Sequence, residues 1–173
     1  MGETVAIVAV ATSAGVSLGT LWAATARERA QRRWQAQEER TRDLRIVLEH
    51  AADELGKATF LANEGLAEVE ANGHLSPARR TLLMNAQRVL VLADLQIKLR
   101  SGGEVREAFF RCVGTFLLMK GILDQAGNQE RAEAWAPTFS NAQADAAANE
   151  RAYFEAAAKA LATPAERRWR QRK

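Results

Sequence analysis

The chain has 173 residues, of which 47% are hydrophobic and 6% aromatic, and its formal net charge is +3. Its one cysteine cannot form an internal disulfide, so the composition excludes a disulfide-stapled scaffold. Three prolines and no long β-branched run beyond the first 26 residues favour an all-α fold, and the length leaves room for one domain after a short N-terminal segment. The many Arg and Ala residues are typical of a bacterial protein encoded by GC-rich DNA.

Residues 4–26 form an uncharged segment near the start of the chain. A helix needs about 20 mainly apolar residues to cross a hydrocarbon core of about 30 Å, so the segment predicts a single-pass transmembrane helix as an anchor over residues 1–26. Basic residues stay on the cytoplasmic side, and aromatic residues mark the interface. The predicted interface consists of Trp22, Arg27, Arg29, Arg32 and Arg33. We therefore expect the protein to lie in the cell inner membrane, with its N-terminus outside and its C-terminal domain in the cytoplasm.

Two alternatives to an anchor are open for this segment. Ala24-Thr25-Ala26 resembles a signal-peptide cleavage site. No basic side chain precedes the apolar run, however, and cleavage would export the arginines. A soluble fold would instead have to wrap a helix that is apolar all round. We expect the segment to be kept as a membrane anchor, and not to be cleaved off or buried in a soluble fold.

Small residues recur every four positions within the same segment. Ala11, Gly15, Gly19 and Ala23 share one helix face, and the two glycines form a GxxxG motif. Such a face lets two helix backbones approach closely in a bilayer, so it predicts a homodimer formed through the anchor. The alternative is that an Ala- and Gly-rich segment produces the pattern without a pairing role.

Residues 27–43 are polar on nearly every face and predict a solvated helical stalk. From residue 44 the pattern becomes amphipathic, and residues 44–163 predict a helical bundle. Apolar residues at spacings of three and four mark its first helix, which we expect to end at Asn72-Gly73. The stripe consists of Leu44, Leu48, Ala51, Leu55, Ala58, Ala62, Leu66 and Val69.

The second bundle helix is predicted to begin at Ser76-Pro77, with Ser as the cap and Pro in the first turn. It should end at residues 101–103. Its core stripe contains Leu83, Ala86, Leu90, Ala93 and Ile97, and a wider stripe adds Leu82, Val89, Leu92, Leu95 and Leu99. A helix that is apolar on most faces is normally buried, so we expect this one to be the most buried of the bundle.

A third helix is predicted from Glu104 to Ala126, because its apolar residues follow a 4-3-4-3-4 spacing like that of a coiled coil. The residues of this seam are Val105, Phe109, Cys112, Phe116, Met119 and Leu123. A fourth helix is expected to open at Pro137 and to bury a stripe that starts at Phe139 and includes Tyr153. Four amphipathic helices joined by short loops predict an antiparallel four-helix bundle.

Residues 164–173 form a basic tail, which an up-down-up-down bundle would return to the end where its first helix enters. A basic residue near an anionic leaflet contributes about 1 kcal/mol, so the tail predicts a contact with anionic lipid. Its candidate residues are Arg167, Arg168, Trp169, Arg170, Arg172 and Lys173. The alternatives are a solvated chain end and, least favoured, nucleic-acid binding.

Few residues suggest catalysis or metal binding. His50 lies near Asp53 and Glu54, but no Glu-x-x-His motif occurs, so we predict no metal site. Cys112 lies on the core seam and is expected to be a buried, unreactive thiol. No acid–base pair or nucleotide-binding motif stands out, so we expect no cofactor and no enzymatic activity.

The sequence thus predicts a membrane-anchored cytosolic helical bundle that acts as a non-enzymatic scaffold, adaptor or regulator. The expected partners are the lipid bilayer, an unidentified protein partner and a second copy in a homodimer, whereas nucleic acid is not expected. One alternative is a membrane-tethered sensor or signalling module. The other is a soluble helical bundle that binds polyanions through its basic ends.

Overall fold

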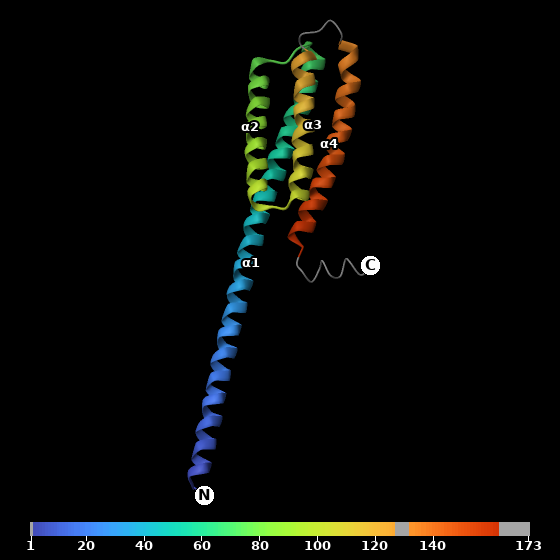
Figure 1. The fold of residues 1–173 in the computed structure, drawn as a ribbon. Coiled ribbons are helices and arrows are strands. Elements are labelled where there is room, and N and C mark those ends of the chain that lie inside the picture. Colours follow the sequence, from blue (N-terminus) through green and yellow to red (C-terminus); the bar gives the residue numbers. More distant parts are fainter. Residues whose placement is uncertain (1, 127–131, 163–173) are drawn as a thin grey trace. The chain divides into compact units, whose positions relative to one another are not determined.

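The computed structural model describes residues 2–126 and 132–162, and the side chains of residues 2–21, 23 and 132–134 are outside that description. The described residues form four α-helices and no strand, which confirms the predicted all-α class. The helices are α1 (Gly2–Asn72), α2 (Pro77–Arg100), α3 (Gly103–Ala126) and α4 (Ala132–Leu161) (Figure 1).

The chain divides into two compact units, Met1–Arg42 and Asp43–Lys173. In the first unit, the described side chains from Trp22 to Arg40 are all exposed. In the second unit, the rest of α1 packs with α2, α3 and α4, which run alternately up and down (Figure 1). The predicted helical bundle is therefore confirmed.

The turn between α1 and α2 forms as the sequence predicts. Gly73 adopts a φ of 73°, and its N–H donates to the Val69 carbonyl at 2.8 Å. This left-handed conformation is open to glycine because it has no Cβ, and it ends the helix. The Ser76 hydroxyl accepts a hydrogen bond from the Arg79 N–H at 3.2 Å, and Pro77 is the first residue of α2.

The limits of the last two helices differ in part from the prediction. α3 ends at Ala126 as expected and begins at Gly103, one residue early. α4 begins at Ala132, so the prediction that Pro137 opens it is wrong. Pro137 lies just beyond the first turn, whose N–H groups have no partner within the helix in any case, and it removes one further backbone hydrogen bond.

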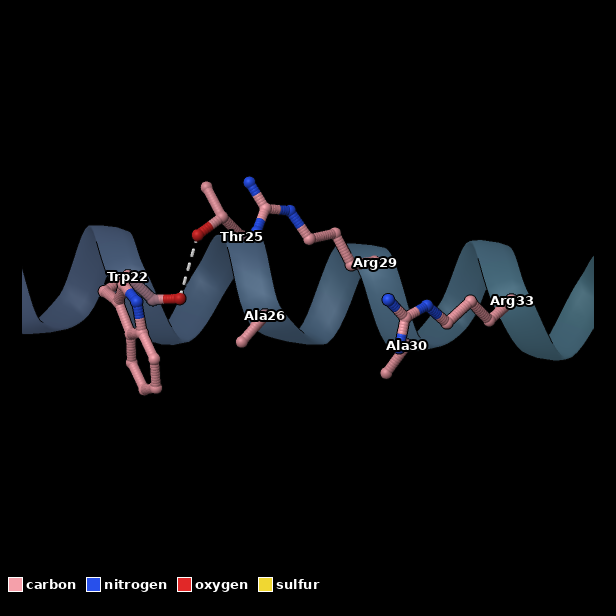
Figure 2. Close-up of a pocket in the computed structure, with 6 residues that line it drawn as sticks. All are labelled: Trp22, Thr25, Ala26, Arg29, Ala30 and Arg33. Carbon is pink, nitrogen blue, oxygen red and sulfur yellow. Dashed lines mark hydrogen bonds between the residues drawn. The ribbon is translucent and has the colours of Figure 1, made fainter.

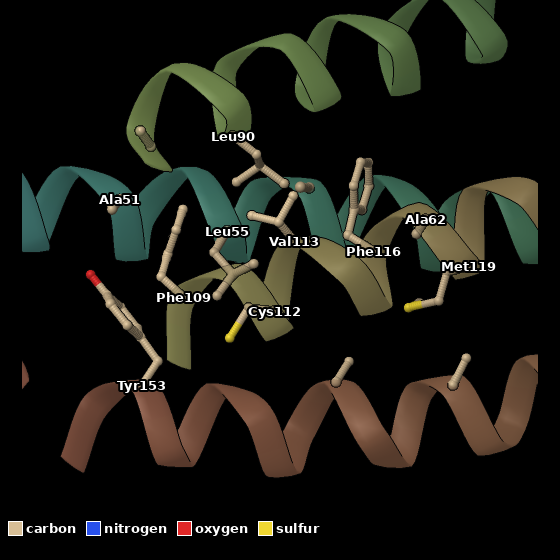
Figure 3. Packing of buried hydrophobic residues seen from close by; sticks show 14 of the residues in the cluster. Ala51, Leu55, Ala62, Leu90, Phe109, Cys112, Val113, Phe116, Met119 and Tyr153 are labelled. Carbon is tan, nitrogen blue, oxygen red and sulfur yellow. The ribbon is translucent and has the colours of Figure 1, made fainter. Parts of the chain in front are cut away.

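The core is built from large side chains of α3 set against small side chains of α1 and α4 (Figure 3). Phe109, Phe116 and Leu123 of the predicted seam are at most 1% exposed. Alanines on the facing helices leave room for these rings and branched chains. They are Ala51, Ala58 and Ala62 on α1 and Ala142, Ala146, Ala156 and Ala157 on α4.

Polar contacts at the edges of the core connect each helix to two neighbours. The Tyr153 hydroxyl, on a fully buried side chain, donates to the Leu48 carbonyl at 2.9 Å and links α4 to α1. The other links are Arg79 to Glu64 and Glu68 between α2 and α1, Arg106 to Asp94 between α3 and α2, and Lys159 to Glu104 between α4 and α3. The helices therefore form a ring in chain order, which is the predicted up-down-up-down arrangement.

The prediction that α2 is the most buried helix is wrong. α2 buries four residues, whereas α3 buries nine. Leu92 and Leu99, which were expected to widen the core stripe, are 59% and 83% exposed. Two neighbours in a ring cover only part of a helix surface, so a helix that is apolar all round keeps an exposed apolar face.

A membrane-spanning helix is not found in the part of the chain that the structure describes. The predicted anchor over residues 1–26 falls mainly on side chains outside that part. It therefore stays a prediction.

Gly65 lies where core leucines pack tightly against α1, and Gly56 on the same helix is a matched control. A Cβ at Gly65 would lie 3.0 Å from Leu123 Cδ1 and 3.3 Å from Leu75 Cδ1, whereas a Cβ at Gly56 would meet nothing within 4 Å. We expect Gly56→Ala to raise the free energy of unfolding by about 1 kcal/mol, through helix propensity alone. Gly65→Ala should gain less or lose stability, because its methyl group must displace both leucines.

Urea unfolding followed by circular dichroism measures both variants. Gly65→Leu should lower the free energy of unfolding by about 1–3 kcal/mol, as overpacking does. An equal gain in stability for Gly65→Ala and Gly56→Ala would contradict the close approach at Gly65.

Candidate functional site

The segment that was predicted to lie at a membrane interface is an exposed stretch of α1. Trp22 is 76% exposed, and its carbonyl accepts a hydrogen bond from the Thr25 hydroxyl at 2.9 Å. Ala26 and Ala30 follow Trp22 on one side of the helix, while Thr25 and Arg29 lie on another (Figure 2). The segment thus combines an apolar stripe that starts at an indole ring with arginines on the adjacent faces.

Arginine charge in this segment is only partly compensated within the described residues. Arg32 pairs with Glu28 four residues earlier, and both side chains are largely exposed. Arg27, Arg29 and Arg33 form no ion pair there. Arginine carries its charge at any physiological pH and binds phosphate well. These arginines thus leave positive charge uncompensated on an exposed helix, and one helix alone offers no enclosed site.

The other predicted contact residues cannot be located. The side chains of Ala11, Gly15, Gly19 and Ala23 lie outside the described residues, as does the whole basic tail from Arg167 to Lys173. Pairing through the small face and binding of lipid by the tail both stay predictions.

The exposed side of α2 is a second candidate surface, and four of its leucines were predicted to lie in the core. Among the described residues, it carries the largest group of exposed apolar side chains on any helix. They are Leu82, Met84, Val91, Leu92, Leu95 and Leu99. Four basic residues of α2 accompany them without an ion pair in the described residues: Arg80, Arg88, Lys98 and Arg100. The 4-3-4 spacing from Met84 through Arg88 and Val91 to Leu95 was the one available signal of a second helix-packing face.

A polar cluster fastens the start of α2 to α1. Glu68 Oε1 accepts the Ser76 backbone N–H at 2.9 Å, and Glu68 Oε2 lies 3.3 Å from Arg79 Nε. Glu64 also pairs with Arg79. Hydrogen bonding from Ser76, followed by the Arg79 guanidinium, holds the pKa of Glu68 below its usual value. The pKa of Arg79 is raised in turn, chiefly by Glu64. Every group has a partner, so the cluster serves the fold.

His50 and Cys112, which were considered for metal binding and catalysis, lie on different helices, α1 and α3. His50 Nδ1 is 3.9 Å from Glu54, which also pairs with Lys57. The described residues contain no group of three or more His, Cys, Asp or Glu side chains that could hold a metal ion. Cys112 is buried among α3 core residues, and burial, ahead of the Glu150 charge, raises the pKa of its thiol to about 12. A thiol with this pKa is protonated at neutral pH and is a poor nucleophile.

Comparison with known proteins identifies no relative of the chain. No family model, curated protein or solved structure matches it.

The polar cluster at the α1–α2 turn should make stability depend on pH through Glu68. A carboxyl whose pKa is lower in the folded state stabilises the fold above its unfolded pKa, near 4.5, and loses this contribution as the pH falls through the folded pKa. We therefore expect Glu68→Gln to lower the urea midpoint at pH 7 and to have little effect near pH 2. Glu70→Gln, at an exposed position on the same helix, should be neutral at both values. An equal loss for Glu68→Gln at both pH values would refute the charge-based explanation.

Proposed function

We propose that the protein is a membrane-anchored helical bundle that acts in the cytoplasm as a non-enzymatic scaffold, adaptor or regulator. The observation that carries the proposal is the exposed apolar and basic face of α2. Exposing so many large apolar side chains on one helix costs free energy. Large exposed apolar patches of this kind mark interaction sites. A partner that covers them would remove this cost.

The anchor itself is supported by the order of residues along α1. The uncharged run of residues 4–26 is followed by four arginines, of which Arg32 alone forms an ion pair within the described residues, and the exposed Trp22 lies near the boundary. This is the order expected where a helix leaves the hydrocarbon core on the cytoplasmic side. The basic tail from Arg167 to Lys173 would add a second contact with anionic lipid.

A membrane-tethered sensor or signalling module is a second candidate. It is favoured by the helical backbone of α1, which runs without a break from Gly2 to Asn72. An unbroken helix that begins in the proposed anchor and ends in the bundle core can transmit a rotation or a shift between them. In this case, a change in pairing of the N-terminal segments would be the signal.

Two arginines placed in the apolar run test the anchor. Each arginine at the centre of a transmembrane helix costs about 2.5–3.5 kcal/mol, so Val8→Arg with Val16→Arg should move the full-length protein from the membrane fraction to the carbonate-soluble fraction. Thr25→Arg with Ala26→Arg adds the same charge at the interfacial end of the run, next to Arg27, and should leave the protein membrane-bound. Wild-type protein in the carbonate supernatant would refute the anchor.

Orientation is measured on the same chain with a C-terminal reporter. A reporter that is active only in an oxidising compartment should stay inactive. Activity of that reporter would place the C-terminal domain outside and refute the cytoplasmic assignment.

A further inference from the structure

The exposed apolar surface of the bundle extends from α2 onto α3. The side chains that define this α2–α3 face are Met84, Val91 and Leu95 on α2 and Phe110 and Leu117 on α3, each between 38% and 61% exposed. All five lie away from the buried stripes marked by Leu90 on α2 and Phe116 on α3. Successive helical residues are about 100° apart, and this spacing places all five on the outward side nearest the other helix.

Two glycines within α3 lie on the same outward side and have no role inside the bundle. A Cβ at Gly114 or Gly121 would meet nothing within 4 Å. An interior glycine destabilises a helix by about 0.8–1.0 kcal/mol relative to alanine. At Gly65 that cost has an internal reason, because Leu123 occupies the space of a side chain. No described side chain of the bundle occupies the corresponding space at Gly114 and Gly121, so a close neighbour there would have to come from another molecule.

The projecting and recessed parts of this face alternate along the bundle. The Arg106–Asp94 pair, with Nε and Oδ1 4.0 Å apart and no hydrogen bond between them, indicates which levels of the antiparallel helices α2 and α3 lie beside each other. Met84 then lies at the level between Gly114 and Gly121, and Val91 lies level with Phe110. Leu95 lies level with the N-terminal part of α3, where Gly103 and Glu107 border an open depression. Met84 and Leu95, which project from α2, therefore stand opposite gaps along α3, whereas Val91 stands opposite Phe110.

We propose that the α2–α3 face binds the same face of a second copy of this chain, around a two-fold axis parallel to the helices. Such an axis keeps every residue at its own level and places α2 of one copy over α3 of the other. Met84 and Leu95 of one copy then enter the gaps beside the glycines of its partner. Val91, Phe110 and Leu117 of both copies meet at the centre of the interface. This proposal deepens the proposed function by naming the partner of the α2 face.

Charge and area both favour a second copy in this arrangement. α2 carries five bases and one acid, so pairing of α2 with α2 would bring like charges together, whereas α3 carries three bases and three acids and accepts α2 without repulsion. A face about 36 Å long and two helices wide covers about 700 Å². This approaches the roughly 800 Å² that each partner buries in a stable complex.

The axis also suits the proposed anchor. α1 of both copies runs in the same direction, so both chains enter their bundles from the same end of the dimer. Two anchors in one membrane require this, whereas an antiparallel dimer would direct them apart.

Cysteine cross-linking of the full-length protein in membranes tests the interface. Val91→Cys places a thiol beside the proposed axis, so a short bismaleimide should convert most of the protein into covalent dimers. Wild-type protein, whose thiol at Cys112 is buried, should not cross-link. Phe154→Cys on α4 and Phe60→Cys on α1 are exposed controls far from the axis and should give few dimers. Dimers formed equally at all three positions, or only at Phe60→Cys, would overturn the proposal, as would their absence at Val91→Cys.

The glycines provide a second test on the Val91→Cys background. Gly114→Leu with Gly121→Leu should fill the gaps and weaken dimerisation by about tenfold or more, the change that a loss of about 1.4 kcal/mol produces. The bundle itself should stay folded because both positions are open in the monomer, and circular dichroism checks this. Gly56→Leu is the matched control on α1 and should leave the dimer intact. Unchanged cross-linking in the double variant would overturn the proposed packing.

These tests fail independently of those for membrane anchoring. The Val8→Arg and Val16→Arg variant removes the anchor but leaves the α2–α3 face unchanged, so its cross-linking at Val91→Cys should persist in solution. Loss of the dimer in that variant alone would show that self-association belongs to the N-terminal segment and would overturn the proposal.

Discussion

The bundle depends on one packing arrangement: the large side chains of α3 fill the space left by alanine-lined faces of α1 and α4. Phe109, Phe116 and Met119 are almost fully buried, and Ala58, Ala62 and Ala142 face the same core. Interiors are packed as densely as organic crystals, so a large side chain on one helix requires a small one opposite. At Gly65 the residue on α1 has no side chain at all, and Leu123 occupies the space that a side chain would fill.

This arrangement explains why α2 differs from the other helices. α3 packs against α4, and the alanines of α1 let this helix pack close to both. α2 completes the bundle and contributes one buried stripe, which contains Leu83, Leu90 and Ile97. Its remaining leucines have no room in a core that is already filled. They face outward beside unpaired basic residues, and in our proposal this surface meets a second copy.

Polar groups of the described residues position the helices. The Tyr153 hydroxyl reaches the Leu48 carbonyl inside the core, and Glu68 holds both Ser76 and Arg79 at the first turn. A buried polar group without a partner is costly, so these contacts favour one arrangement of the helices over others. The surfaces that we propose for function are the Trp22–Arg33 segment of α1 and the apolar face of α2 and α3.

The sequence by itself determined the helices, their main stops and most of their buried faces. Gly73 and Ser76-Pro77 set the first turn through backbone chemistry that acts over a few residues. The seam from Val105 to Leu123 is visible because a helix repeats every 3.6 residues. Pro137 was misjudged because a proline near a helix start is tolerated at several positions. Only the tertiary structure decided which of two apolar faces of α2 is covered. Periodicity shows that residues such as Leu83 and Leu95 are apolar, but their burial depends on how many neighbours a helix has and how much volume these leave between them.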